Sequence, residues 1–265
     1  MKEVILTPKG RIGIMVEAET ICPHVMQPLG SEEIAALPVW QGPQKHPLAE
    51  FFEVHVASEG DKEETRIVIE GDVSRVKRIG QGMKSGTIVI NGSAGMHLGA
   101  EMSGGSITVK GNAGSWAGME MKGGVLHILG DAEDHVGSAY RGSWRGMTGG
   151  QIAIDGNARS QLGGGMVGGQ IVVQGNVENF CGIRQSGGAI VIQGSAVRGA
   201  GAEMSGGTLA VAGEIRQMCP GFVELGRDEN PKAGEIELHG WFTRLAGDYA
   251  IFKNPKGTLL CREVC

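Results

Sequence analysis

Aromatic residues are scarce in this chain, at 5% of its 265 residues. Its five cysteines show no Cys-x-x-Cys spacing, which argues against a disulfide framework, a zinc knuckle or an iron–sulfur cluster and predicts reduced thiols. No run of about 18 apolar residues is present to span a membrane, and the N-terminal residues lack the apolar core of a secretion signal. The net charge of −5 disfavours nucleic acid. These absences predict a cytoplasmic protein with neither membrane nor nucleic acid as a partner.

Catalytic signatures are also missing. The chain has no G-x-x-x-x-G-K-[ST] phosphate loop, no G-x-S-x-G nucleophile motif and no His-x-His or His-Glu-x-x-His spacing. One match to G-x-G-x-x-G, at Gly163 to Gly168, lies inside a repeat and precedes another strand, not the helix of a dinucleotide site. The acidic stretch Asp131 to His135 is interpreted as a solvated corner in preference to a cation site. We therefore expect this chain to contribute no catalytic residue and no metal site of its own.

Glycine, by contrast, is abundant, with 47 residues, and it follows a repeat. A glycine closes each of nine short apolar runs, and five of the eight spacings between these anchor glycines are 19 residues. The other spacings are 21, 26 and 27 residues and indicate insertions. A unit this short cannot bury its own apolar face, whereas stacked copies can. The anchors are Gly71, Gly92, Gly111, Gly130, Gly156, Gly175, Gly194, Gly213 and Gly240.

The run before each anchor alternates like a strand with one buried face. In "SITVKG", for example, Ile107 and Val109 are the apolar positions and Thr108 lies between them. The alternation and the repeat predict an all-β fold, a single-stranded right-handed parallel β-helix of about nine coils with glycines at its corners. We expect residues 61–240 to form the β-helix and residues 241–265 to form a C-terminal cap and tail. Residues 1–60 are expected to form an N-terminal cap, with a short helix from Ser31 to Pro38 and a strand over 49–56.

The outward position of each strand is largely apolar along the repeats. It is occupied by Val68, Val89, Thr108, His127, Ala153, Val172, Val191, Ala210 and Glu237. A stand-alone carbohydrate-acting β-helix enzyme, the alternative from another functional class, needs carboxylates and aromatic subsites on such a face. The apolar column instead favours burial against another subunit.

One repeat departs from the pattern in an informative way. Between Gly137 and Met147 the sequence "GSAYRGSWRGM" carries seven extra residues, among them Tyr140, Arg141, Trp144 and Arg145. Aromatic residues together with arginine are typical of interface hot spots, and arginine also pairs with carboxylates. Because insertions in repeat proteins often form the binding face, we expect this one to contact either a protein or an anionic ligand.

The repeated "GN/SAG…AG…M.GG.I.V.G" pattern resembles the GXGXG domain that glutamate synthase large subunits share with the C subunit of formylmethanofuran dehydrogenase. The N-terminal "VEAETICPHVMQPLGSEEIAALPVWQG…LAEFFEV" and the "YRGSWRGMTGG" insertion are similar to this C subunit specifically. The resemblance implies a noncatalytic scaffold that bridges the catalytic subunits of an enzyme complex of one-carbon metabolism.

This family is found in two settings. One is the formyltransferase/hydrolase complex of methylotrophic bacteria, which moves a formyl group from tetrahydromethanopterin to a methanofuran-type carrier and hydrolyses it to formate. The other is the molybdenum or tungsten formylmethanofuran dehydrogenase of archaea. A composition without enrichment in ion-pairing residues favours the bacterial setting. The resemblance then implies amidohydrolase-like and formyltransferase-like partners and a glutamate-rich carrier. The residues expected to contact carrier or partner are Arg141, Arg145, Lys122 and Arg184, with Tyr140 and Trp144 at an interface.

Overall fold

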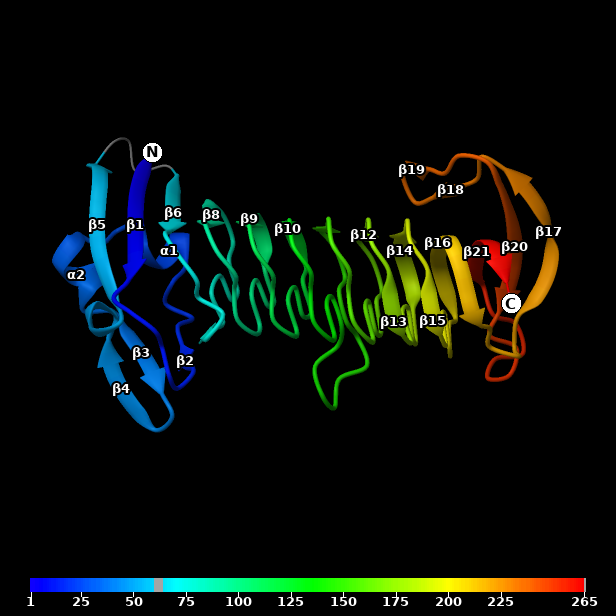
Figure 1. The fold of residues 1–265 in the computed structure, drawn as a ribbon, viewed down its shortest axis with the longest axis horizontal. Coiled ribbons are helices and arrows are strands. Elements are labelled where there is room, and N and C mark those ends of the chain that lie inside the picture. Colours follow the sequence, from blue (N-terminus) through cyan, green and yellow to red (C-terminus); the bar gives the residue numbers. More distant parts are fainter. Residues whose placement is uncertain (60–63, 265) are drawn as a thin grey trace.

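The N-terminal part of the chain forms one end of an elongated molecule (Figure 1). The computed structural model describes residues 1–59 and 64–264. Strand β1 (Lys2–Pro8) lies between β5 (Phe52–Glu59), which runs antiparallel to it, and β6 (Thr65–Ile69), which runs parallel. The predicted strand over 49–56 is thus confirmed as β5, beginning at Phe52. The domain boundary predicted between residues 60 and 61 lies outside the described residues.

Short elements connect β1 to β5 and pack around the buried side chains of Ile21, Met26 and Ile34. The helix predicted to begin at Ser31 is confirmed, and its first turn is held by the Glu33 carboxylate, which accepts a hydrogen bond from the Gly30 N–H at 2.7 Å. The elements are β2 (Val16–Glu17), α1 (Pro23–Met26), α2 (Ser31–Ala35), β3 (Pro38–Gln41), β4 (Gln44–Pro47) and the 3-10 helix η1 (Leu48–Glu50).

The middle of the chain is a ladder of parallel strands, one from each repeat. Equivalent repeat positions face each other in every pair, so that Ile107 pairs with Ile88 on one side and with Leu126 on the other. This alignment is what the constant repeat length predicts. After β6 the strands are β8 (Thr87–Ile90), β9 (Ser103–Val109), β10 (Gly123–Ile128), β11 (Gln151–Ile154), β12 (Gln170–Val173), β14 (Ser186–Ile192) and β16 (Gly206–Gln217).

A second line of parallel contacts joins the repeats two residues after the anchor glycines. Isolated bridges run from Val73 through four alanines to Val177, and β13 (Val177–Asn179) and β15 (Ala196–Arg198) continue the line to β16. Closer to the N-terminus, β7 (Val76–Lys77) pairs instead with β2. The residue just after the anchor adds a ladder of its own. Its side-chain oxygen accepts a hydrogen bond from the equivalent backbone N–H of the next repeat, as Asn157 Oδ1 does from Asn176 at 2.9 Å.

The interior is filled by columns of identical or similar side chains. The inward strand residues, such as Ile88, Ile107 and Leu126, are fully buried, as the alternation predicts. A methionine column runs beside them, and Gln185 takes one methionine position by donating hydrogen bonds to three backbone carbonyls. Stacking is close enough to require glycine at the strand starts, because a Cβ on Gly123 would lie 2.5 Å from the Ser103 carbonyl oxygen. The interior therefore accounts for both the apolar and the glycine positions of the repeat.

The C-terminal part corrects two predictions. The run "EIELHG" was expected to be the last strand of the ladder, but β19 (Ile236–Glu237) pairs only with β18 (Lys232–Ala233), in an antiparallel hairpin. The expected tail supplies the last rung instead. Strand β21 (Gly257–Val264) runs parallel to β16 and places Leu259 and Cys261 in the interior columns. Strand β20 (Trp241–Gly247) then adds antiparallel to β21, and β17 (Val223–Glu229) adds antiparallel to β20.

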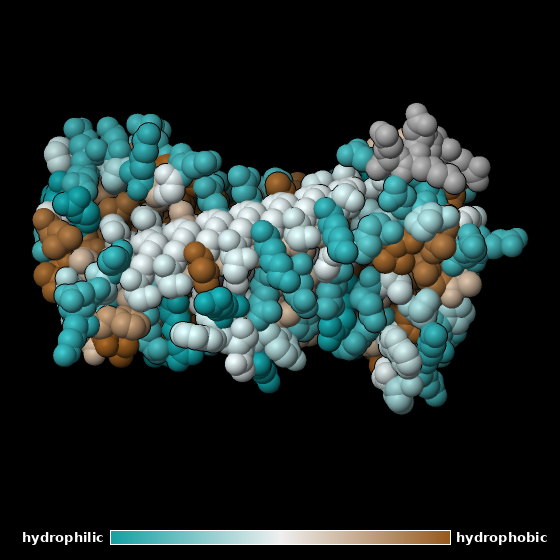
Figure 2. Space-filling view, turned by 180° about the vertical axis from the view of Figure 1, so that it is seen from behind, coloured by the Kyte–Doolittle hydropathy of each residue, from teal (hydrophilic) through white to brown (hydrophobic). Residues whose placement is uncertain are grey.

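The hairpin explains why "EIELHG" satisfies the strand pattern without entering the ladder. Its apolar side chains pack against the outward column, where Val191 and Ala210 are fully buried beneath Ala233, Leu238 and Phe242. Glu237 is therefore not part of that column, and the chain covers the C-terminal end of the column itself. Farther along, Val89, Ala153 and Val172 remain half-buried. Viewed from the opposite side, a pale band of nearly neutral hydropathy runs along the middle and apolar atoms gather toward both ends (Figure 2).

Candidate functional site

The insertion predicted between Gly137 and Met147 leaves the repeat as a loop and returns to it. In a regular repeat the methionine N–H bonds the carbonyl oxygen of the corner glycine, as Met121 does to Gly118 at 3.1 Å. The same bond closes the neck of the insertion, from Met147 N–H to the Gly137 carbonyl at 3.0 Å. The loop, residues 138–146, projects from the side of the molecule (Figure 1).

Beside the neck lies a stack of aromatic and imidazole rings. His97, Trp116 and His135 occupy the fifth position after their anchor glycines, so the repeat places each above the last. The rings of Trp116 and His135 are parallel within 10°, with centroids 4.1 Å apart, and His97 stacks 6.1 Å away on the other face. Tyr140, from the insertion, tilts against Trp116 with a centroid distance of 6.0 Å. We name these four residues the ring stack.

The backbones of His97, Trp116 and His135 all have a positive φ, between 60° and 67°. Such a conformation costs a non-glycine residue on the order of 1–3 kcal/mol, so the surrounding structure must impose it. The same position has positive φ in Gln161 and Phe180, which indicates a corner of the repeat and not a local distortion. The sequence signal that could have revealed the stack is therefore one column of large rings among small residues.

The loop and the ring stack enclose a hollow of about 210 Å³. It brings together four of the predicted site residues: Tyr140, Arg141, Trp144 and Arg184. Trp116 and His135 also line it. Trp116 was not predicted as a site residue, and His135 was predicted only as the end of an acidic, solvated corner. Arg145 is exposed on the loop, and the backbone of Lys122 lies beneath Gly149, but neither residue is among those lining the hollow.

The charges around the hollow are unevenly paired. The Arg184 guanidinium binds the Glu203 carboxylate at 2.8 Å, and this hydrogen bond raises the pKa of Arg184. The Glu120 carboxylate accepts a hydrogen bond from the Tyr140 N–H at 3.0 Å. Arg141 and Arg145, in contrast, form no ion pair with any of the described residues. The unpaired positive charge is thus concentrated on the loop.

The imidazoles of the ring stack are held in the neutral form. Burial lowers the pKa of His135, and the charge of Arg141 lowers it further against the opposing effect of Asp134. Burial likewise lowers the pKa of His97, aided by Arg78 and Lys77 and opposed by Glu17. At neutral pH the stack is therefore uncharged.

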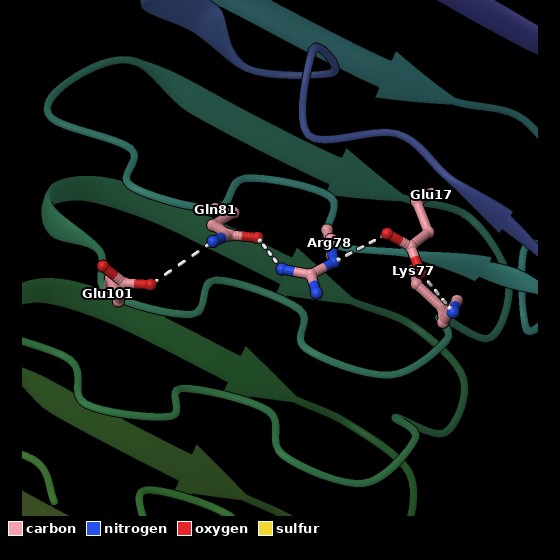
Figure 3. A network of polar contacts seen from close by, with 5 residues as sticks. All are labelled: Glu17, Lys77, Arg78, Gln81 and Glu101. Carbon is pink, nitrogen blue, oxygen red and sulfur yellow. Dashed lines mark hydrogen bonds and ion pairs between the residues drawn. The ribbon is translucent and has the colours of Figure 1, made fainter. Parts of the chain in front are cut away.

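A polar network joins the N-terminal segment to the first two repeats (Figure 3). Glu17 accepts from Lys77 at 2.6 Å and lies 3.2 Å from the Arg78 guanidinium. Arg78 donates to Gln81, and Gln81 donates to Glu101 in the next repeat. The hydrogen bond from Lys77 lowers the pKa of Glu17 in spite of its partial burial. The network fixes β2 to the first repeats.

Within residues 1–59 and 64–264, no three His, Cys, Asp or Glu side chains gather to hold a metal ion. Burial raises the pKa of the Cys22 thiol to about 12 and that of Cys261 to about 11, which keeps both protonated and unreactive. No helix of the described part has the length and hydropathy to cross a bilayer. The site offers aromatic rings and guanidinium groups for contact.

Known proteins share sequence with part of this chain and fold with nearly all of it. No protein-family model matches. The C subunit of the molybdenum-containing formylmethanofuran dehydrogenase 1 of Methanosarcina barkeri is 55% identical over 98 residues, 37% of this chain and 33% of that protein. The C subunit of the tungsten-containing formylmethanofuran dehydrogenase 2 of Methanothermobacter wolfeii is 43% identical over 99 residues, 37% of each chain. The matched segment thus spans about a third of these relatives.

A chain in the crystal structure of the formyltransferase/hydrolase complex (FhcABCD) from Methylorubrum extorquens, solved with methylofuran, has a TM-score of 0.84 and 29% identity. The likeness covers 97% of this chain and 98% of that one. The resemblance to the C subunit of formylmethanofuran dehydrogenase read from the repeat is thereby confirmed by sequence over about a third of the chain. The likeness to a chain of the formyltransferase/hydrolase complex extends over almost all of it.

Proposed function

We propose that this chain is a noncatalytic scaffold subunit of a formyltransferase/hydrolase complex of one-carbon metabolism. The complex would transfer a formyl group from tetrahydromethanopterin to a methanofuran-type carrier and hydrolyse it to formate. The observation that carries the proposal is the fold match over 97% of the chain to a chain of such a complex.

The proposal includes an architecture suited to a scaffold. The stacked repeats are proposed to form a right-handed parallel β-helix of about nine coils, with β21 as the last rung. Residues 1–60 would cap one end, the repeats from residue 61 to β16 together with β21 would form the β-helix, and β20 and β17 would close the other end. The parallel register and the second line of bridges support this arrangement.

The partners are proposed to be amidohydrolase-like and formyltransferase-like subunits in the cytoplasm. Arg141, Arg145, Lys122 and Arg184 are proposed to contact either the anionic carrier or a partner, and Tyr140 and Trp144 an interface. The likeness to a complex solved with methylofuran supports a carrier of this type in the assembly. This chain alone is not proposed to hold a cofactor.

A second candidate is the C subunit of a molybdenum or tungsten formylmethanofuran dehydrogenase. The 55% identity over 98 residues to the Methanosarcina barkeri protein favours it. The two candidates share the scaffold role and differ in the metal content of the assembly.

Purification of the complex from the native host through a tag on this chain tests both candidates. Mass spectrometry identifies the retained subunits, and elemental analysis measures molybdenum and tungsten. Amidohydrolase-like and formyltransferase-like subunits without either metal support the first candidate. Stoichiometric metal with iron–sulfur subunits supports the second. Recovery of this chain alone contradicts both.

A further inference from the structure

We propose that the loop of residues 138–146 is a preformed docking element that binds an apolar pocket bordered by carboxylates on a partner protein subunit. The inference rests on the proposed function, because it assumes that the chain assembles with other subunits. It goes beyond that function by choosing between carrier and protein as the occupant of this site and by separating the residues that hold the loop from those that bind.

The base of the loop is fixed to the repeats. Its neck is closed by the bond between Met147 and Gly137, and Ala139 and Gly146 donate backbone hydrogen bonds to Gly164 and Gly165 of the next repeat, at 2.9 and 2.8 Å. The Tyr140 ring packs on Trp116, and its backbone N–H donates to the Glu120 carboxylate. Because the loop is ordered before binding, a partner does not have to offset the entropy of ordering it.

The tip of the loop carries exposed side chains that the rest of the described chain does not bind. The Trp144 side chain is 77% exposed, the most exposed of the large apolar side chains in the described part of the chain. Arg141 and Arg145 stand on either side of it in sequence and are free of ion pairs to described residues. A tryptophan flanked by arginines is the composition of a hot spot, and its complement is an apolar pocket with an acidic rim.

The arrangement argues against the anionic carrier as the occupant. A polyanion needs several unpaired cations that converge, but Arg184 is already bound to Glu203, and neither Lys122 nor Arg145 lines the hollow. The carboxylate of Glu120 also stands at the base of the loop. Only Arg141 among the four predicted cations is both unpaired and at the hollow.

The test is co-expression of the full chain with the amidohydrolase-like and formyltransferase-like subunits of its host, followed by measurement of subunit affinity. Trp144→Ala and the double variant Arg141→Glu/Arg145→Glu are expected to weaken assembly about tenfold or more and leave the melting temperature of the isolated chain unchanged. Trp144→Phe is expected to retain most of the affinity. Trp241→Ala and Arg11→Glu, both at exposed positions far from the loop in sequence, serve as matched controls and are expected to assemble normally.

Assembly of Trp144→Ala with wild-type affinity would overturn the inference while leaving the scaffold role intact. The inference also fails if the variants assemble normally but the purified complex loses its carrier, because the loop would then bind the ligand. Failure of the wild-type chain to assemble with either partner would overturn the proposed function itself, and the inference with it.

Discussion

Two consecutive repeats, the regular one from Gly111 and the expanded one from Gly130, close the same corner with the same bond but with different lengths of chain between the bonded residues. Both use the bond from a buried methionine to a corner glycine, at 3.1 Å in the first and 3.0 Å in the second. The first has two residues between these bonded positions, and the second has nine, including an exposed tryptophan. The fold therefore depends on the stacked positions and leaves the residues between them free for recognition. Substitutions should destabilise the protein according to their place in the stack.

The largest effect is expected from a charge in an inward column. Ile107 is fully buried between Ile88 and Leu126, so Ile107→Asp places an unpaired carboxylate in the interior. We expect a loss of more than about 4 kcal/mol in the free energy of unfolding, measured by urea denaturation. Thr108→Asp, one residue away and facing outward, is expected to cost less than about 1 kcal/mol. Equal sensitivity of the two positions would contradict the assignment of inward and outward columns.

The stacking contact itself is tested by adding a single methyl group. In Gly123→Ala the new Cβ would meet the Ser103 carbonyl oxygen at 2.5 Å, so the backbones of two repeats must separate. Overpacking of this kind costs about 1–3 kcal/mol, which a lower melting temperature would report. Gly13→Ala is the matched control, because nothing lies within 4 Å of the added Cβ. Equal melting temperatures of Gly123→Ala and Gly13→Ala would contradict the close packing of the repeats.

A smaller loss is expected from the surface ladder. Asn157→Ala removes the oxygen that accepts the Asn176 N–H, a bond worth about 0.5–1.5 kcal/mol. Asn157→Ser should restore most of the stability, since Ser93 and Ser195 fill the same position and accept the equivalent bond from the next repeat. Differential scanning calorimetry of the three proteins measures the order. Equal stability of the alanine and serine variants would show that this hydrogen bond does not contribute to the stability of the fold.

The pH dependence of stability tests the burial of the two histidines in the ring stack. Because burial lowers the pKa of His97 and His135 in the folded state, the unfolded chain binds protons more readily below about pH 6.5. These groups therefore reduce stability progressively as the pH falls below that value, and they have no effect above it. The double variant His97→Gln/His135→Gln should show a shallower loss of unfolding free energy between pH 7.5 and 5. An unchanged slope would mean that the two imidazoles are protonated freely in the fold.

The sequence alone was sufficient for the ladder, because its physical requirements recur in every repeat. Ile107 and Val109 alternate as a half-buried strand must, and the glycine pair before them is demanded by backbone contact. The helix at Ser31 was equally local, since its capping residue and the following proline lie within a few positions of it. These elements depend on near neighbours or on copies of themselves.

The wrong predictions arose where the same alternating sequence pattern fits two positions in the fold. Ile236 and Leu238 alternate as a ladder strand does, yet their hairpin packs on the outward face, where Leu238 covers Val191 and Ala210. Leu259 and Cys261 fit the interior columns as well and take the final rung. Tertiary packing determines which of these two segments forms the final rung, and the local sequence of neither segment predicts the outcome. The site divided in the same way: Tyr140 and Trp144 were visible as an insertion, but the contact of Tyr140 with Trp116 depends on stacking across repeats.

The aligned register fixes distances along the length of the molecule. Each repeat advances the ladder by one strand spacing, about 4.8 Å, and the backbone contacts between glycines leave little freedom to stretch or compress it. The loop of residues 138–146 therefore stands a set number of steps from either end, where the two terminal units begin. Gain or loss of one 19-residue unit would move anything bound at an end toward or away from the loop by one step, without altering either contact surface.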